Sequence, residues 1–129
     1  MFITALNCID GRLQRVVLDF IKDIYNIEFV DMITAPGIDG FFLKDKVLRD
    51  YIKESIFISL EKHNSKNILV FGHEDCAGNP VKNQEHIENI KRVVDYIKEN
   101  WLKDEEEIEV KGFFLRKEND YKWIVEEVI

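Results

Sequence analysis

The sequence predicts an α/β fold of three layers, in which helices flank a mostly parallel β-sheet. Segments with the apolar spacing of helices alternate along the chain with short apolar segments that are typical of buried strands. Strands that alternate with helices usually form a parallel sheet, because each crossover helix returns the chain to the same end of the sheet. The length of 129 residues, with 46% hydrophobic residues, indicates one domain over residues 1–129.

The first half of the chain is predicted to contain two strands and two helices. Residues 2–7 form a short, mostly buried strand, and residues 27–33 form a second strand rich in β-branched side chains. Between them, helical spacing places apolar side chains on one face: Leu13, Val16, Val17, Phe20, Ile21 and Ile24. Residues 35–40 have turn chemistry. A second helix is expected over 45–62, with these side chains facing the core: Val47, Leu48, Tyr51, Ile52 and Ile56.

The second half is predicted to contain one helix and three strands. Residues 67–72 form the third strand and residues 108–115 the fourth. The helix between them, over 84–102, has an apolar stripe: Ile87, Ile90, Val94, Ile97 and Trp101. The acidic run 104–107 is interpreted as a solvated turn. Residues 121–128 form a fifth strand, so the sheet would combine about four parallel strands with one antiparallel edge strand.

Side chains with metal-binding chemistry follow two of the predicted strands. Cys8 comes directly after the first strand, and His73 and Cys76 follow the third. In open α/β sheets, ligands bind beyond the carboxyl ends of the strands, where the direction of winding reverses. If the first and third strands are neighbours at such a point, the three side chains converge in one crevice. Two thiolates and an imidazole suit zinc, and they leave the fourth tetrahedral position open.

The residues alone leave other interpretations open. A cysteine after a strand is more often a packed core residue than a ligand. A disulfide between Cys8 and Cys76 is geometrically conceivable, although a reducing compartment argues against it. Asp10 and Arg12 have two compatible interpretations. Arg12 clamps the Asp10 carboxylate and keeps it ionised, or Asp10 caps the first helix while Arg12 lies in solvent.

Two short motifs resemble the zinc signatures of the β-class carbonic anhydrases. Residues 8–12 read Cys-Ile-Asp-Gly-Arg, and residues 73–78 read His-Glu-Asp-Cys-Ala-Gly. They are similar to that family's Cys-x-Asp-x-Arg after its first core strand and His-x-x-Cys after its third. The resemblance implies that Zn²⁺ is the cofactor and that its ligands are Cys8, His73 and Cys76. It also implies a catalytic dyad formed by Asp10 and Arg12.

The chain departs from the family's pattern in several places. Gly11 stands where the family usually has Ser, and Ala77 stands where it usually has Gly. Residues 33–37 replace a segment that often reads Arg-Asn-Ala-Gly in the family. We also expect no counterpart of the family's N-terminal helical arm. The zinc site is therefore expected to match the family more closely than the substrate pocket does.

By this resemblance, the expected activity is that of a zinc lyase that reversibly hydrates CO2 to bicarbonate through zinc hydroxide. Two alternatives stay open: a zinc hydrolase of a CO2-like molecule such as carbonyl sulfide or carbon disulfide, and a non-catalytic zinc-bound member of the fold. His63 and His86 have the chemistry of proton shuttles, but their polar helical surroundings favour surface positions. Glu74 and Asp75 are either shuttles or solvated side chains.

The expected partners are CO2, bicarbonate and further copies of the chain. The net charge of −7 argues against nucleic-acid binding, and apolar runs of four residues argue against a membrane span. The N-terminus has no signal-peptide layout, so a cytoplasmic location is expected. The resemblance implies a homodimer or larger assembly. Two adjacent aromatic residues in an extended segment cannot both face inward, so we expect Phe41 or Phe42 near the contact. The pair Phe113-Phe114 either adds to a contact or lies in a strand buried on both faces.

Overall fold

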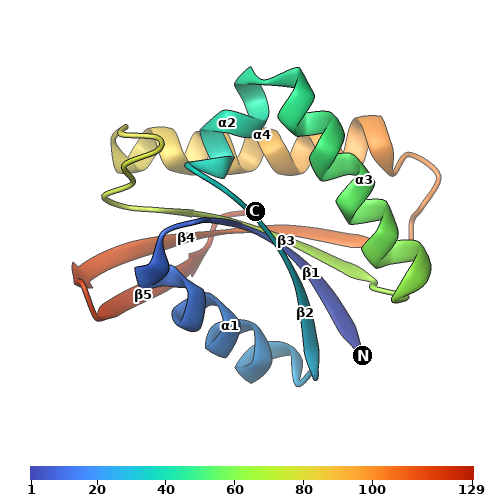
Figure 1. Cartoon of the computed structure of the whole chain (residues 1–129), viewed down its shortest axis with the longest axis horizontal. Helices are drawn as coiled ribbons and strands as arrows, with labels where there is room; N and C mark the ends of the chain where they lie inside the picture. Colours follow the sequence, from blue (N-terminus) through green and yellow to red (C-terminus); the bar gives the residue numbers. More distant parts are fainter.

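The computed structural model describes residues 1–129 and contains one five-stranded β-sheet (Figure 1). Its strands are β1 (Phe2–Cys8), β2 (Phe29–Ala35), β3 (Asn67–His73), β4 (Glu109–Asn119) and β5 (Lys122–Glu127). They lie in the order β2-β1-β3-β4-β5. The first four strands of this order run parallel, whereas β5 pairs antiparallel with β4 at the edge. The predicted fold class is therefore confirmed.

Helices cover both faces of the sheet and complete three layers (Figure 1). They are α1 (Gly11–Tyr25), α2 (Ile38–Lys44), α3 (Lys46–Lys62) and α4 (Asn83–Trp101). α1 covers one face alone, and the other three helices cover the opposite face. The sheet therefore divides the core into two clusters, one under α1 around Phe71 and a larger one under α2, α3 and α4 around Phe114. None of the helices combines the length and the apolar composition that crossing a bilayer requires.

The segment after β2 forms a helix that the sequence analysis did not predict. Gly37 adopts a left-handed conformation, with a φ of 51°, as its turn chemistry suggests. The chain then continues directly into α2, because Phe42 can be buried completely against Tyr96 and Trp101 of α4. Neighbouring side chains on a helix do not alternate between two faces as they do on a strand. Phe41 accordingly lies beside Phe42 on the helix and is 37% exposed.

α3 buries only part of the predicted face. Ile52 and Ile56 are fully buried as expected, whereas Val47 is 81% exposed and Tyr51 is 62% exposed. The buried face also includes Ser59, whose hydroxyl lies 2.6 Å from that of Thr4 in β1. This hydrogen bond between two buried hydroxyls satisfies both groups and fixes the rotation of the helix against the sheet. Apolar periodicity alone could not reveal a polar contact in the core.

The sheet topology creates a crevice at the carboxyl ends of β1 and β3. The chain passes from β1 to β2 by way of α1 on one face, and it returns by way of α2 and α3 on the other face to β3. Such a reversal leaves the ends of the two adjacent strands uncovered between the connections. Cys8 ends β1 and His73 ends β3. Residues two positions apart on a strand share a face, so Cys8 lies on the face of Leu6, in the larger cluster, and His73 lies on the face of Phe71, in the α1 cluster. The two side chains therefore start from opposite faces of the sheet.

Candidate metal centre

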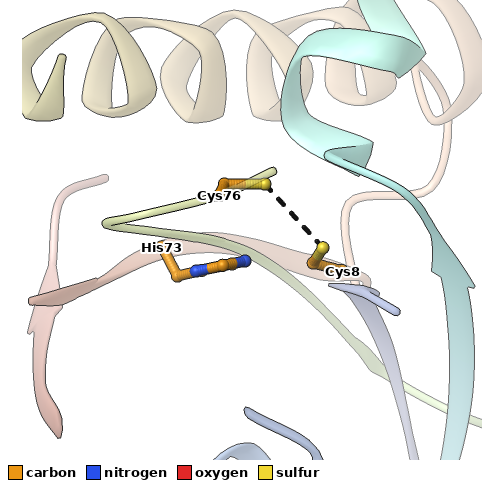
Figure 2. Close-up of side chains that lie close together, drawn as sticks. All are labelled: Cys8, His73 and Cys76. Atoms are coloured by element: carbon orange, nitrogen blue, oxygen red, sulfur yellow. Dashed lines mark hydrogen bonds between the residues drawn. The ribbon is translucent and has the colours of Figure 1, made fainter. Parts of the chain in front are cut away.

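Cys8, His73 and Cys76 converge in this crevice (Figure 2). Their metal-binding atoms all lie within 4.8 Å of one another, and all three residues are buried. Cys76 reaches the site from the loop that follows β3. The two sulfur atoms are 3.8 Å apart and belong to free thiols, so no disulfide joins them.

The geometry of these side chains fits a zinc ion. Two sulfur atoms at about 2.3 Å from a tetrahedral ion are about 3.8 Å apart, which matches the observed distance of 3.8 Å. Nδ1 of His73 lies 2.7 Å from the carbonyl oxygen of Glu74. Nδ1 therefore donates its hydrogen to Glu74, and Nε2 keeps a free lone pair. This Nε2 atom is buried and has no hydrogen-bond partner, so an ion held by the sulfurs would supply the partner that the protein lacks.

The two sulfurs are hydrogen-bonded to each other and differ in acidity. The hydrogen bond with Cys76 lowers the pKa of Cys8 well below its usual range, against the opposing effect of burial. Backbone hydrogen bonds from Asp10 and from Gly37, whose nitrogen lies 3.4 Å from the sulfur, lower the pKa further. The same hydrogen bond and burial raise the pKa of Cys76. Cys8 is thus the more acidic of the two thiols, and a divalent ion that bound both sulfurs would displace their protons.

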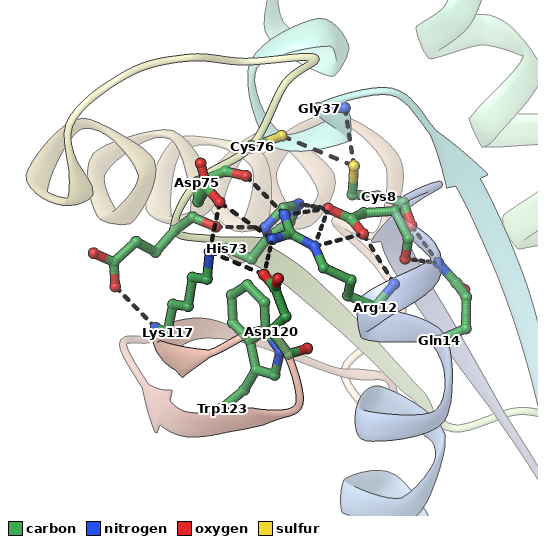
Figure 3. A network of polar contacts seen from close by, with 12 residues as sticks. Cys8, Arg12, Gln14, Gly37, His73, Asp75, Cys76, Lys117, Asp120 and Trp123 are labelled. Atoms are coloured by element: carbon green, nitrogen blue, oxygen red, sulfur yellow. Dashed lines mark hydrogen bonds and ion pairs between the residues drawn. The ribbon is translucent and has the colours of Figure 1, made fainter.

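Asp10 and Arg12 form an ion pair beside these three residues (Figure 3). Arg12 donates from Nη2 to Oδ2 of Asp10 at 2.7 Å, and from Nε to both oxygens at 3.2 Å. Its backbone N–H also donates to Oδ1, so Asp10 caps α1 while Arg12 clamps it. The hydrogen bonds from the Arg12 side chain lower the pKa of the Asp10 carboxyl. An ionised oxygen of Asp10 consequently lies 4.0 Å from Nε2 of His73.

The outer side of Arg12 contacts a hairpin that the sequence analysis did not single out. Nη1 donates to Asp120 at 2.8 Å and to Asp75 at 3.1 Å, and the guanidinium carbon lies 5.3 Å from the ring centre of Trp123. Lys117 forms ion pairs with the same two aspartates. One signal in the sequence points to this hairpin. Because β4 runs parallel to β1 and β3, the turn that follows it lies at the edge where their carboxyl ends meet.

A comparison of the sequence with known protein families finds one family that matches this chain. A family model described as "Putative carbonic anhydrase" matches residues 1–129, the full length of the sequence. The chain belongs to this carbonic anhydrase family. The resemblance that the two motifs indicated is therefore confirmed at the level of the family.

Solved structures of carbonic anhydrases, among them β-class enzymes, have the same fold as this family member. Isoform I from Trichomonas vaginalis superposes with a TM-score of 0.65 at 19% identity, covering 98% of this chain and 81% of its own. The enzyme from Streptococcus mutans gives 0.66 at 17% identity, with coverage of 98% and 81%. One of two tetrameric enzymes from Sordaria macrospora gives 0.59 at 14% identity, with coverage of 97% and 79%. No curated protein sequence matches this chain significantly.

The other two histidines of this carbonic anhydrase family member are each bonded to a different carboxylate. The predicted surface position of His86 is wrong, because the first turn of α4 packs against α2. His86 is fully buried there, with Nδ1 2.7 Å from Asp39. The side chain of His63 is 41% exposed, in agreement with its predicted surface position. Its Nδ1 lies 2.6 Å from Oδ2 of Asp31. Neither imidazole is hydrogen-bonded to Cys8, His73 or Cys76.

Glu74 and Asp75 connect the loop that carries Cys76 to β4. Oε1 of Glu74 accepts a hydrogen bond of 2.8 Å from the backbone N–H of Lys117. Asp75 has a left-handed backbone, with a φ of 59°, and its side chain accepts from both Lys117 and Arg12. Both acidic side chains are thus held by partners in the protein, Glu74 half-buried and Asp75 exposed to solvent.

The loop that carries Cys76 packs backbone to backbone against the turn before α2. A Cβ atom added to Gly37 would lie 2.5 Å from the backbone carbon of Gly78. The Gly78 atom in this contact belongs to the backbone, so it cannot move aside as a flexible side chain could. The left-handed backbone of Gly37 also disfavours any residue with a Cβ atom. Glycine is therefore required where the two loops around the cysteines meet.

The variant Gly37→Ala is expected to lower the free energy of unfolding by about 2 kcal/mol, because the clash and the backbone strain add. Urea denaturation measures this loss. Gly11→Ala is the matched control, since nothing lies within 4 Å of a Cβ atom there and the residue begins α1. That change should leave stability equal or higher by up to about 1 kcal/mol. Equal unfolding curves for the two variants would contradict the close contact.

Proposed function

We propose that residues 1–129 form one zinc-binding domain with carbonic anhydrase activity, a lyase that reversibly hydrates CO2 to bicarbonate. The observation that carries the proposal is the juxtaposition of Cys8, His73 and Cys76 with the Asp10 carboxylate that Arg12 clamps. The family match over the full sequence supports it.

In this proposal, the three converging residues hold Zn²⁺ as two thiolates and one neutral imidazole. A bound zinc ion would supply a Lewis acid that lowers the pKa of a water molecule, so that a nucleophile forms near neutral pH. The carbonyl of Glu74 keeps His73 in the tautomer whose Nε2 can bind, by accepting the hydrogen of Nδ1. Two thiolates balance the charge of the ion, so the activation of water depends more on neighbouring residues. A cytoplasmic location suits such ligands, because thiols stay reduced there.

Asp10 is the residue best placed to orient the attacking water. Its Oδ2 lies 4.0 Å from Nε2 of His73, so a water molecule beside the three ligand candidates would be within hydrogen-bonding reach. By accepting one hydrogen of that water, Asp10 would turn the oxygen lone pair toward CO2. Arg12 contributes by holding the carboxylate ionised and in place. Hydration then adds the water oxygen to the carbon of CO2, and the proton released leaves to solvent.

Stopped-flow measurement of CO2 hydration by the zinc-loaded protein tests this function. We expect a rate well above the uncatalysed one, lost on treatment with a chelator and restored by zinc. Carbonyl sulfide and carbon disulfide are assayed in parallel. Hydrolysis of either without CO2 hydration would identify a zinc hydrolase instead, and zinc-loaded protein that is inactive on all three substrates would be a non-catalytic member of the fold.

We also propose that the protein is a homodimer, with Phe41 near the contact. Phe42 is fully buried and cannot take part, which corrects one of the two predicted positions. Phe113 and Phe114 are 2% and 0% exposed, so they belong to a strand buried on both faces rather than to a contact. Phe41 is the remaining candidate, and it lies on α2 next to the turn that contacts Cys8.

Sedimentation at micromolar concentration should give twice the chain mass of 15.3 kDa. Phe41→Asp is expected to shift the protein toward the monomer, because a carboxylate would be desolvated in the contact. Tyr121→Asp is the matched control, since Tyr121 is 95% exposed at the tip of the β4–β5 hairpin and should leave the dimer intact. A fully active monomer would show that the chain completes its site alone.

A further inference from the structure

One aromatic side chain of the β4–β5 hairpin contacts both a metal-ligand candidate and the partner of Asp10 (Figure 3). Trp123 is 9% exposed, and its ring meets the His73 imidazole nearly edge to face, with centroids 5.8 Å apart and an interplanar angle of 81°. The Arg12 guanidinium lies over the same ring at 5.3 Å. Both contacts are of favourable kinds, the first between ring edge and face and the second between a cation and a π-system.

Asp120, at the start of the hairpin turn, is hydrogen-bonded to both Arg12 and Trp123. The side chain of Asp120 accepts a hydrogen bond of 2.8 Å from Nη1 of Arg12 and lies 3.0 Å from Nζ of Lys117. Its backbone carbonyl accepts a hydrogen bond of 3.2 Å from Nε1 of Trp123. Asp120 therefore holds Arg12 by charge and holds the Trp123 ring in the orientation that contacts Arg12.

These contacts account for the whole hydrogen-bonding capacity of the guanidinium. Nε and Nη2 point at Asp10, and Nη2 also donates to the backbone carbonyl of Asp75 at 3.1 Å. Nη1 donates to Asp75 and Asp120. An arginine side chain has five N–H donors in a rigid planar fork. The fork is therefore held on one side by Asp10 and on the other by Asp75 and Asp120, and it cannot rotate without breaking ion pairs on both sides.

The fixed position of Arg12 has a consequence for Asp10. Oδ2 of Asp10 is only 4.0 Å from Nε2 of His73, which is close enough for a small rotation of the carboxylate to bring it to an ion bound by the cluster. The hydrogen bonds from Arg12 are the contacts that oppose such a rotation. We propose that Asp120 and Trp123 are positioning residues that hold Arg12 against Asp10 and thereby keep the Asp10 carboxylate off the metal. This inference rests on the part of the proposed function that assigns a metal to the cluster.

Replacing zinc by Co²⁺ provides a direct readout, because the visible spectrum of bound Co²⁺ changes when a carboxylate joins the ligand set. Asp120→Asn and Trp123→Leu are expected to shift the spectrum toward that of a carboxylate-bound ion and to lower CO2 hydration about tenfold, since each removes one restraint on Arg12. Trp123→Phe keeps an aromatic face and should restore most of both properties. The double variant Asp10→Asn, Asp120→Asn should return the spectrum to that of the unmodified protein.

Glu118→Gln is the matched control, because Glu118 lies on the same hairpin and pairs only with Lys122. It should leave the spectrum and the rate unchanged. Unshifted spectra for Asp120→Asn and Trp123→Leu would overturn the inference, and so would loss of Co²⁺ from both variants, which would indicate a structural role. Protein that binds Co²⁺ but does not hydrate CO2 would refute only the proposed activity, since the spectra still report the position of Asp10. Unmodified protein that binds neither zinc nor Co²⁺ would refute both.

Discussion

Purified Cys76→Ala is expected to contain almost no zinc, whereas the unmodified protein should contain about one zinc ion per chain. Two remaining ligand candidates cannot complete a site that has three protein ligands, so the affinity should fall by more than about 100-fold. Cys8→Ala and His73→Ala should behave in the same way, because the three metal-binding atoms belong to one cluster within 4.8 Å. Elemental analysis after dialysis against a weak chelator measures the zinc content.

His63→Ala is the control for loss of a histidine outside the cluster. His63 is bonded to Asp31 and not to any of the three converging residues, so its replacement should leave the zinc content unchanged. A full complement of zinc in Cys76→Ala would remove the basis for the proposed site. Loss of zinc from His63→Ala would mean that the metal is held elsewhere.

Arg12→Ala should keep its zinc and lose about 99% of its CO2 hydration activity. General acid–base groups typically contribute about 100-fold or more, and Asp10 depends on Arg12 for both its ionisation and its position. Without the guanidinium, the carboxylate is free to rotate toward the metal or into solvent. Stopped-flow kinetics on samples of equal zinc content separate this effect from metal loss.

The matched control is Arg15→Ala, one turn further along α1, where the side chain is exposed. It removes the same charge from the same helix and should leave the rate within about twofold of the unmodified protein. Unchanged turnover in Arg12→Ala would leave the dyad without support. Loss of zinc would instead assign Arg12 a role in building the cluster.

The convergence of Cys8, His73 and Cys76 could be predicted from the sequence because it depends on simple rules. Cys8 and His73 end strands that are recognisable from short apolar runs, and Cys76 follows in the next loop. The alternation of strands and helices predicts parallel strands whose carboxyl ends meet at one edge. Once β1 and β3 are neighbours, these residues need no further information to come close together.

The contacts of Arg12 with the hairpin could not be predicted in the same way. Asp120 is 108 positions away in sequence, and its approach depends on the antiparallel register of β5 on β4, including an irregularity near Asn119. The burial of His86 was missed for a related reason. It pairs with Asp39 on another helix, and periodicity on a single helix does not show which polar side chains find a buried partner.

Because Cys8 ends β1 and His73 ends β3, an ion bound to both residues would affect how the fold opens locally. The two clusters of the core lie on opposite faces of the sheet, and each strand contributes alternate side chains to both. An ion held by Cys8 and His73 would be a direct bond between the two strands, at the edge where strands fray most easily. The pairing of β1 with β3 ends at Leu6 and Val70, before either residue is reached. Separation of the two strands at this end would then require the ion to be released, so both strands would be protected from local unfolding together.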